Sequence, residues 1–228
     1  MGLILNLETA TTVCSVALAK DGHLIALEEL NGDYTHAENL TVFIERVLQK
    51  ASISLNSIDA IAISKGPGSY TGLRIGVSTA KGLCYSLNKP LIAINTLEHC
   101  AVAASQIKGD VDSLFCPMID ARRMEVYCAI FDKSGNVVSP TAAVIIDEHS
   151  FQDLLQKQKI YFFGDGAEKC KTILTAHKNA VFIDQLFPSA KNMIQLSENA
   201  FNNKQFEDVA YFQPFYLKDF VAGKKKEV

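Results

Sequence analysis

The predicted strands and helices of this chain follow one order, and that order occurs twice along its 228 residues. Short apolar or β-branched runs predict strands, and apolar residues three and four positions apart predict helices. Asp21-Gly22 indicates a tight hairpin between the second and third strands. In the first half we expect strands at 2–7, 12–20, 23–30, 60–64 and 90–95, and helices at 35–50, 73–86 and 96–106.

The second half repeats the series of three strands, helix, strand, helix, strand, helix. A polar turn at 133–136 separates its second and third strands, and Pro140 makes the third strand irregular. We expect strands at 114–119, 125–131, 137–146, 160–163 and 180–183, and helices at 150–157, 167–176 and 190–202.

Three strands joined by short turns should pair antiparallel, and each strand that follows a helix should add in parallel through a right-handed crossover. We therefore expect an α/β fold with a duplicated βββαβαβα unit, forming two subdomains with mixed sheets. The subdomains would span 1–108 and 109–212, and 213–228 would be a tail with a disordered end. A single continuous α/β domain with an accidental repeat remains the alternative.

Composition narrows the classes of function. Apolar residues make up 48% of the chain, enough for a core, while a net charge of −3 argues against binding nucleic acid alone. No apolar run reaches the ~18 residues of a membrane helix, and Glu8 comes too early for a signal peptide. The six cysteines are widely spaced, which favours reduced core residues in a cytoplasmic protein over a disulfide or zinc framework.

The duplicated order is typical of the actin-like ATPase and ribonuclease H-like folds, in which actin-like proteins hold ATP between two such domains. Such a site would have a carboxylate at the end of the first strand and glycine-rich loops around the phosphates. Here these positions are degraded, because Glu8 replaces the usual aspartate and the loop after it has no glycine. The residues of a vestigial nucleotide site would be Glu8, Thr9, Asp120, Gly164 and Gly166. Gly164 and Gly166 also fit a simple helix entry, which we favour.

Other signatures of catalysis are missing from the sequence. The glycine-rich run at 66–72 follows a strand, but its spacing is not that of a nucleotide loop, and a tight strand-to-helix turn explains it as well. The five histidines show no metal-ligand spacing, and no motif pairs Ser69 or Cys14 with a base. We therefore expect no catalytic residue and no metal site in this chain.

A partner-binding face is the remaining functional prediction. Gly72, Gly76 and Ala80 form a small-residue stripe on the helix at 73–86, near Ser69 and Gly82. Glycine weakens a helix, so close approach of another backbone is expected there, either a partner or this chain's own sheet. If a partner packs on this stripe, replacing Gly76 with Leu should block assembly and leave the monomer folded. Thr35 and Glu38 form a capping box, and His36 in that first turn should be exposed. The expected partner contacts are His36, Glu38, Leu40, Phe43, Val47, Ser69, Gly72, Gly76 and Ala80.

The residues together resemble the TsaB (YeaZ) family, over nearly the full length. The most specific run is Gly-Pro-Gly-Ser-Tyr-Thr-Gly-Leu-Arg-Ile-Gly at 66–76, and Asp-Ala-Arg-Arg-Met-Glu-Val-Tyr at 120–127 supports it. Further support comes from 4–10 with 14–18, 36–40, 80–83 and 214–217.

The resemblance implies a non-catalytic subunit of the bacterial system that makes threonylcarbamoyladenosine in tRNA. It implies a heterodimer with the catalytic subunit TsaD through the N-terminal helices, and a larger complex with the ATPase TsaE. Homodimers through the same face would form without that partner. ATP and metal would bind to the partner subunits, and this chain would touch tRNA only indirectly. The alternative is an actin-like ATPase or small-molecule kinase with ATP between the halves. A metallopeptidase is ranked last.

Overall fold

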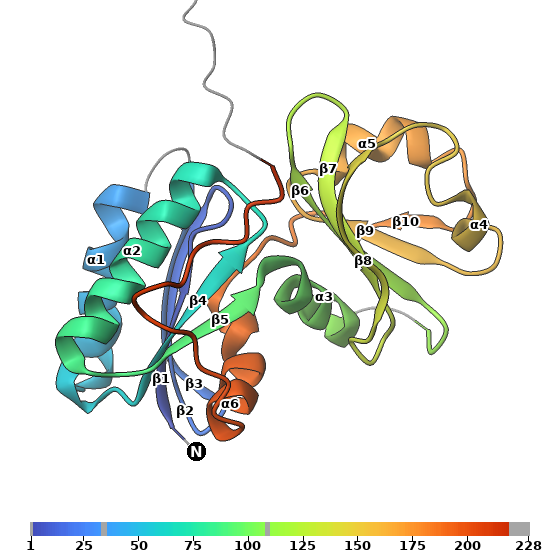
Figure 1. Ribbon diagram of the computed structural model, residues 1–228. Coiled ribbons are helices and arrows are strands. Elements are labelled where there is room, and N and C mark those ends of the chain that lie inside the picture. The colour runs from blue at the N-terminus through green and yellow to red at the C-terminus, as the bar shows by residue number, and fades with distance from the viewer. Residues whose placement is uncertain (1, 33–35, 108–109, 219–228) are drawn as a thin grey trace, which may run out of the picture.

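The computed structural model describes residues 2–32, 36–107 and 110–218 and shows two halves, each built on a five-stranded sheet (Figure 1). The first sheet has the order β3-β2-β1-β4-β5, and the second has the order β10-β9-β6-β7-β8. The strands of the first sheet are β1 (Leu3–Glu8), β2 (Val13–Lys20), β3 (His23–Asn31), β4 (Ala60–Gly66) and β5 (Leu91–Asn95). Those of the second are β6 (Leu114–Asp120), β7 (Glu125–Phe131), β8 (Val137–Ile145), β9 (Ile160–Phe163) and β10 (Ala180–Phe182).

The two sheets have the same topology when the second is read from β8. In each, the first three strands pair antiparallel, and the fourth and fifth add in parallel on the other side of the first. The central strand β1 is buried along its whole length, as its apolar sequence predicts. The predicted duplicated α/β fold is therefore confirmed.

The helices lie close to their predicted positions, with one exception in the second half. They are α1 (His36–Ala51), α2 (Tyr70–Leu87), α3 (Thr96–Ile107), α4 (Gln152–Leu155), α5 (Ala167–Leu174) and α6 (Ile194–Asn202), with 3-10 turns η1 (Leu55–Ser57) and η2 (Ala190–Met193). The helix predicted at 150–157 is wrong in length, since α4 is a single turn. Within the described part of the chain, no helix is long and apolar enough to cross a bilayer.

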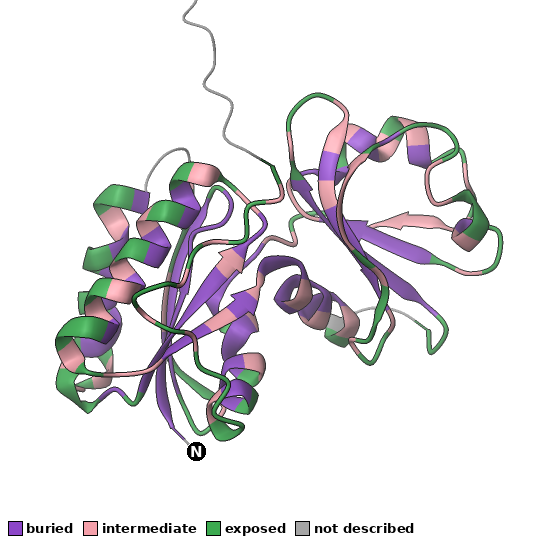
Figure 2. Ribbon diagram, in the orientation of Figure 1, coloured by how far each residue is buried: buried purple, intermediate pink, exposed green. Residues whose placement is uncertain are grey.

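Helices α1 and α2 cover one face of the first sheet, and their outward sides are exposed (Figure 2). The apolar stripe of α1, with Leu40, Phe43 and Val47, faces β2 and β3 and is part of the core of this half. Thr35, the predicted capping residue, lies outside the described residues.

Helices α3 and α6 each pack on the sheet of the other half. Leu97 and Ala104 of α3 lie in one core with Phe115 and Phe163 of the second sheet. In return, Ala200 of α6 packs in a core with strands of the first sheet. Each sheet is thus covered by a helix from the opposite half of the sequence. The division of the chain at residue 108 stays a prediction.

The C-terminal segment binds along the first half and then reaches the second (Figure 1). The amide of Glu207 donates to the carbonyl of Leu91 at 2.9 Å, and the amide of Phe215 donates to the carbonyl of Lys65 at 2.7 Å. Lys218 then forms an ion pair with Glu125 of β7. The described part of the predicted tail is therefore held in place, while 219–228 lie outside the described residues.

The exchange of helices predicts where a core mutation will act. Replacing Leu97 with Ala leaves a cavity against the second sheet, so we expect a loss of about 2–5 kcal/mol in the free energy of unfolding. Amide hydrogen exchange should accelerate in β6 and β9 more than in β4 and β5, although Leu97 directly follows β5 in sequence. The control is Leu40→Ala in α1, which should accelerate exchange in the first sheet. Equal acceleration in the two sheets for Leu97→Ala would contradict the assignment.

Candidate functional site

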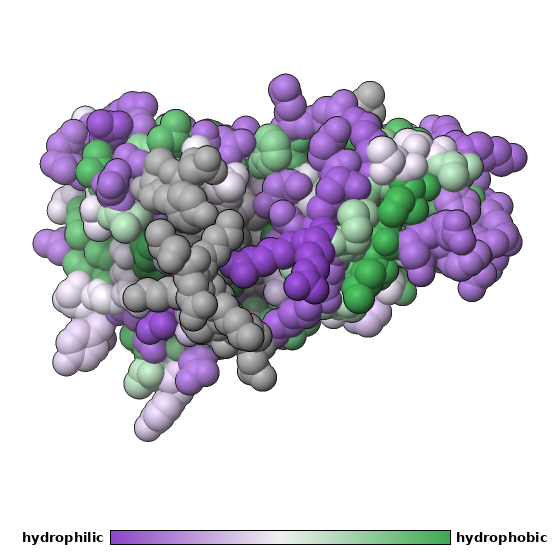
Figure 3. All heavy atoms as spheres, turned by 90° about the horizontal axis from the view of Figure 1, so that it is seen from above, coloured by the Kyte–Doolittle hydropathy of each residue, from purple (hydrophilic) through white to green (hydrophobic). Residues whose placement is uncertain are grey.

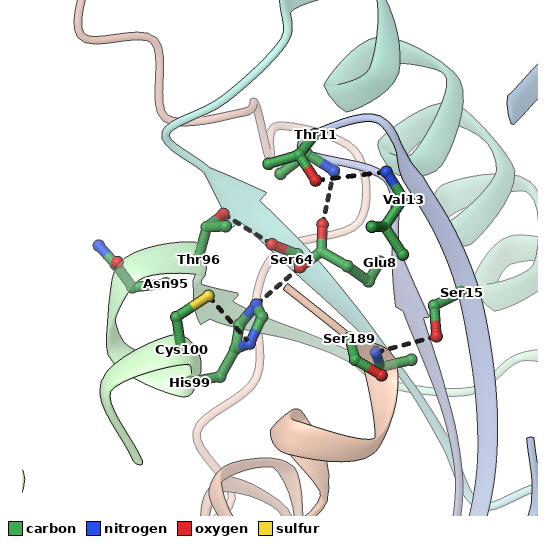
Figure 4. Close-up of polar contacts among 12 residues, drawn as sticks. Glu8, Thr11, Val13, Ser15, Ser64, Asn95, Thr96, His99, Cys100 and Ser189 are labelled. Carbon is green, nitrogen blue, oxygen red and sulfur yellow. Dashed lines mark hydrogen bonds and ion pairs between the residues drawn. The ribbon is translucent and has the colours of Figure 1, made fainter. Parts of the chain in front are cut away.

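The end of β1 carries a buried carboxylate whose two oxygens are both engaged (Figure 4). Oε1 of Glu8 accepts from the amide of Ala10 at 2.5 Å, and Oε2 lies 2.6 Å from Nε2 of His99. Both side chains are fully buried. The hydrogen bond between Oε2 and Nε2 thus joins the two side chains in the core. The position expected to meet a metal-bound phosphate is thus occupied by a histidine from α3.

Helix α3 is anchored between the two halves at this point. Its first residue, Thr96, shares a 2.7 Å hydrogen bond with Ser64 of β4. Asn95 caps the helix by accepting from the amide of Leu97 at 2.9 Å. Burial raises the pKa of the Cys100 thiol well above its usual range, and the negative charges of Glu8 and Asp165 add to this effect. Since those acids come from different halves, Cys100 lies where the halves meet.

The glycine-rich segment packs on the loop that follows β1. A Cβ at Gly68 would overlap the carbonyl of Ala10, and one at Gly72 or Gly76 would overlap Thr9. Hydroxyl Oγ1 of Thr9 donates to the carbonyl of Gly72 at 2.8 Å. The four-residue spacing of these glycines therefore lets α2 approach this chain's own backbone. The alternative left open by the sequence, that the stripe packs internally, is the one observed for Gly72 and Gly76.

The structure also corrects the expected exposure of the partner contacts. His36 is buried, and its Nε2 lies 2.6 Å from the carbonyl of Thr11, so the prediction that it is exposed was wrong. The remaining buried members of the predicted set are Leu40, Phe43, Val47, Gly72, Gly76 and Ala80. These have no surface to offer a partner, because α1 and α2 turn them toward the first sheet. Their burial argues against direct contact with a partner, and the contact role of these seven residues stays a prediction.

The outer faces of α1 and α2 carry a different set of residues. Glu38 and Ser69, two of the predicted contacts, are exposed. Val42 of α1 is an exposed apolar side chain, and Ser78 of α2 is exposed as well. Gly82 is exposed, and a Cβ built there meets nothing within 4 Å. Unlike Gly72 and Gly76, it has no internal contact that requires glycine.

The equivalent loops of the second half are similarly closed. Asp120 is paired with Lys169 and accepts from the amide of Arg122 at 2.8 Å. A Cβ at Gly164 would overlap the carbonyl of Met118, and Gly164 has a φ of 99°, which favours glycine. A Cβ at Gly166 would lie 2.9 Å from the carbonyl carbon of Ile119, so Gly166 also packs on the end of β6. These contacts are those of a tight helix entry, the interpretation that the sequence favoured.

Two polar residues of this region, the buried His99 and the half-buried Asp165, were not singled out from the sequence. His99 lies 91 positions from Glu8, and nothing in its local pattern indicates a buried partner. Asp165 stands between Gly164 and Gly166, and that Gly-Asp-Gly signal could have marked it. Burial raises the pKa of Asp165 from 3.8 to about 6, and the charge of Asp120 contributes. In the residues that the structure describes, no cluster of three or more acids, histidines or cysteines could hold a metal ion.

Comparison with known proteins gives consistent matches over nearly the whole chain. A family model described as TsaD, tRNA N6-adenosine threonylcarbamoyltransferase, matches residues 32–226. A protein from Escherichia coli named tRNA threonylcarbamoyladenosine biosynthesis protein TsaB is 32% identical over 97% of each chain. A tRNA N6-adenosine threonylcarbamoyltransferase from Geotalea daltonii is 29% identical, over 48% of this chain and 36% of its own length.

Solved structures show the same relationship. The structure of YeaZ from Pseudomonas aeruginosa has a TM-score of 0.76 at 25% identity and covers 95% of this chain and 100% of its own. An activator of 2-hydroxyisocaproyl-CoA dehydratase from Clostridium difficile, solved with bound ADPNP, has a TM-score of 0.52 at 9% identity and covers 89% of this chain and 96% of its own. The latter likeness extends to the fold alone, which is the predicted actin-like ATPase fold.

The glycine contacts predict opposite effects for one substitution at two positions of α2. Gly76→Ala should destabilise the protein by about 1–3 kcal/mol, because the new methyl group overlaps Thr9 and Ile63. Gly82→Ala should stabilise it by about 0.5–1 kcal/mol, because the site is open and alanine favours helix. Chemical denaturation measures both. In a Thr9→Ala background the cost of Gly76→Ala should shrink; an unchanged cost would contradict the contact.

The raised pKa of Asp165 predicts a pH-dependent stability. Its folded pKa of about 6 lies above the unfolded value of 3.8, so ionisation is more costly in the folded state. The wild type should therefore lose up to about 3 kcal/mol relative to Asp165→Asn as pH rises from 4 to above 6. At pH 4 the two proteins should differ little, since asparagine keeps the acceptor for the amide of Asp120. Unfolding free energies at several pH values measure this difference, and a constant difference would contradict it.

Proposed function

Because the chain belongs to the TsaB (YeaZ) family of tRNA threonylcarbamoyladenosine biosynthesis proteins, we propose that it is a non-catalytic subunit that activates the threonylcarbamoyltransferase TsaD by binding to it. The modification is threonylcarbamoylation of adenosine 37 in tRNA. The observation that carries the non-catalytic role is the engaged carboxylate of Glu8. Both of its oxygens are used inside the protein, and His99 covers the position where a metal-bound phosphate would be expected.

An ATPase or kinase with ATP between the halves is the alternative. It would require Glu8 to leave His99, which would leave the fully buried His99 without its partner, and that is costly. Titration calorimetry on the isolated protein distinguishes the two functions. We expect no micromolar ATP binding and no turnover. Hydrolysis of ATP at ordinary enzyme rates would contradict the proposal.

The likeness of this chain to the transferase itself supports TsaD as the direct partner. Both the family model and the Geotalea daltonii protein carry the transferase name. A surface that pairs with its own copy through a two-fold axis can also pair with the equivalent surface of a related chain. The same face would thus serve in a homodimer of this chain and in the heterodimer. TsaE would join that heterodimer in a larger complex.

The outer side of α1 and α2 is the surface that fits this role. Val42 offers exposed apolar area, and Glu38 lies near the start of α1. Ser78 and Gly82 leave α2 without bulky side chains at two positions one helical turn apart. Glycine at an exposed helix position weakens the helix without an internal benefit, whereas a partner helix packed there would require it. The interface is thus proposed on this outer side and not on the buried stripe.

A bulky side chain introduced at Gly82 is the sharpest test of this surface. Gly82→Leu should prevent co-purification with TsaD and abolish threonylcarbamoyladenosine formation in a reconstituted reaction with tRNA. The monomer should stay folded, because Gly82 is exposed and a Cβ built there has open space around it. Gly82→Ala should assemble more weakly, and Thr172→Leu on the exposed side of α5 is the matched control. Full assembly and modification with Gly82→Leu would contradict the proposed interface.

A further inference from the structure

A line of cationic and aromatic side chains crosses from the first half to the second at the C-terminal segment. We call it the cationic strip and define it by Arg74, Tyr70, Tyr216, Lys218, Arg122 and Arg123. None of these residues belongs to the buried pair at Glu8. Arg74 lies one helical turn before Ser78 on α2, so this end of the strip adjoins the face proposed for TsaD, while Arg122 and Arg123 lie in the other half. Strongly hydrophilic side chains gather over this middle region in the view from above (Figure 3).

In the first half, the strip is an aromatic pair beside a guanidinium. Arg74 donates to the hydroxyl of Tyr70 at 3.2 Å, and its guanidinium lies 5.4 Å from the centre of that ring. The ring of Tyr70 stands 5.0 Å from that of Tyr216. Tyr216 is 38% exposed, so an apolar ring remains open to solvent next to a positive charge.

In the second half, the strip is the hairpin turn between β6 and β7. Arg122 and Arg123 are both exposed and both have left-handed backbones, with φ of 70° and 48°. Residues other than glycine and asparagine rarely adopt that conformation, and two arginines in succession are unfavourable for the fold alone. The turn nevertheless presents two arginines to solvent. Such unfavourable backbones are concentrated at functional sites.

The positive charge of this turn has no partner in the described structure. Neither guanidinium forms an ion pair with a described residue, and the two acids that flank the turn in sequence are paired with lysines. Asp120 is paired with Lys169, and Glu125 is paired with Lys218. The turn thus presents two arginines that no described carboxylate pairs, on a chain with a net charge of −3.

We propose that the cationic strip binds RNA directly, as a looped or single-stranded segment of the tRNA substrate. The arginines of the turn would contact phosphates, and an unstacked base would stack on Tyr216. Exposed aromatic rings beside arginine are the usual means of binding unpaired RNA. This inference rests on the proposed function, because RNA reaches the strip only if the chain works in the tRNA-modifying complex. An acidic protein surface would use the arginines but would leave the ring unexplained.

The experiment measures tRNA affinity of the complex of this chain with TsaD, as a function of salt. Arg122→Asn with Arg123→Asn removes both charges with a residue that tolerates the left-handed backbone. We expect roughly ten-fold weaker binding and a salt slope reduced by about 1.5, for two lost phosphate contacts. Lys157→Gln with Lys178→Gln, two exposed lysines at the far end of the same half, should change neither quantity.

Two further variants separate charge from stacking. Arg122→Lys with Arg123→Lys should keep most of the salt slope, because the charges remain. Tyr216→Ala should weaken binding several-fold with no change in slope, because a ring carries no charge. In steady-state modification, the arginine variant should raise KM for tRNA and leave kcat unchanged.

The outcomes distinguish this proposal from the one it rests on. Unchanged tRNA affinity in an intact complex, with both arginines replaced, would overturn the strip as an RNA site. Loss of the complex with TsaD in that variant would show instead that the strip binds protein, and would also overturn it. If the wild type does not assemble with TsaD at all, the proposed function fails. The isolated chain is then compared with the arginine variant by cross-linking to tRNA at low salt, and equal yields would overturn the strip.

Discussion

The buried pair of Glu8 and His99 is the interaction on which the arrangement of the two halves depends. Both partners are fully buried, and removing either would leave an uncompensated polar group in the core. His99 can reach Glu8 only if α3 begins at the edge of the first sheet, where Thr96 binds Ser64. The rest of α3 then extends over the second sheet. The same contact therefore fills the candidate nucleotide position and joins the halves.

The sequence predicts most of the helices and strands, but it predicts little of how they pack against one another. Strand and helix periodicity is local, so the order of the elements and the two sheets follow from it, and α3 begins at the predicted residue. The apolar face of a helix does not indicate which sheet it will cover. The packing of α3 on the second sheet and of α6 on the first could therefore not be predicted. His36 has a position typical of an exposed first turn, but a carbonyl that is 25 residues away binds it in the core.

The glycines of α2 are present for different reasons, and only the structure distinguishes these reasons. Gly72 and Gly76 are required because Thr9 lies against them, whereas Gly82 of the same helix touches nothing. The four-residue spacing predicts a shared face for the first two, and it does not tell whether that face meets a partner or this chain. The contact with Thr9 explains why glycine is needed at the first two positions, but it does not explain the glycine at position 82. Gly82, on the outer side of α2, therefore says more about assembly than the buried Gly72 and Gly76 do.

The charge distribution agrees with a subunit that contacts RNA only as part of an assembly. A chain with a net charge of −3 repels a polyanion at long range, and the two uncompensated arginines of the turn act only within about a Debye length, some 8 Å. A local cationic strip on such a chain cannot capture tRNA from solution with high affinity. It gains effect once another surface holds the tRNA nearby, since the second contact is then intramolecular. A catalytic partner that binds the same tRNA supplies that condition, which links the RNA contact to the outer face of α1 and α2.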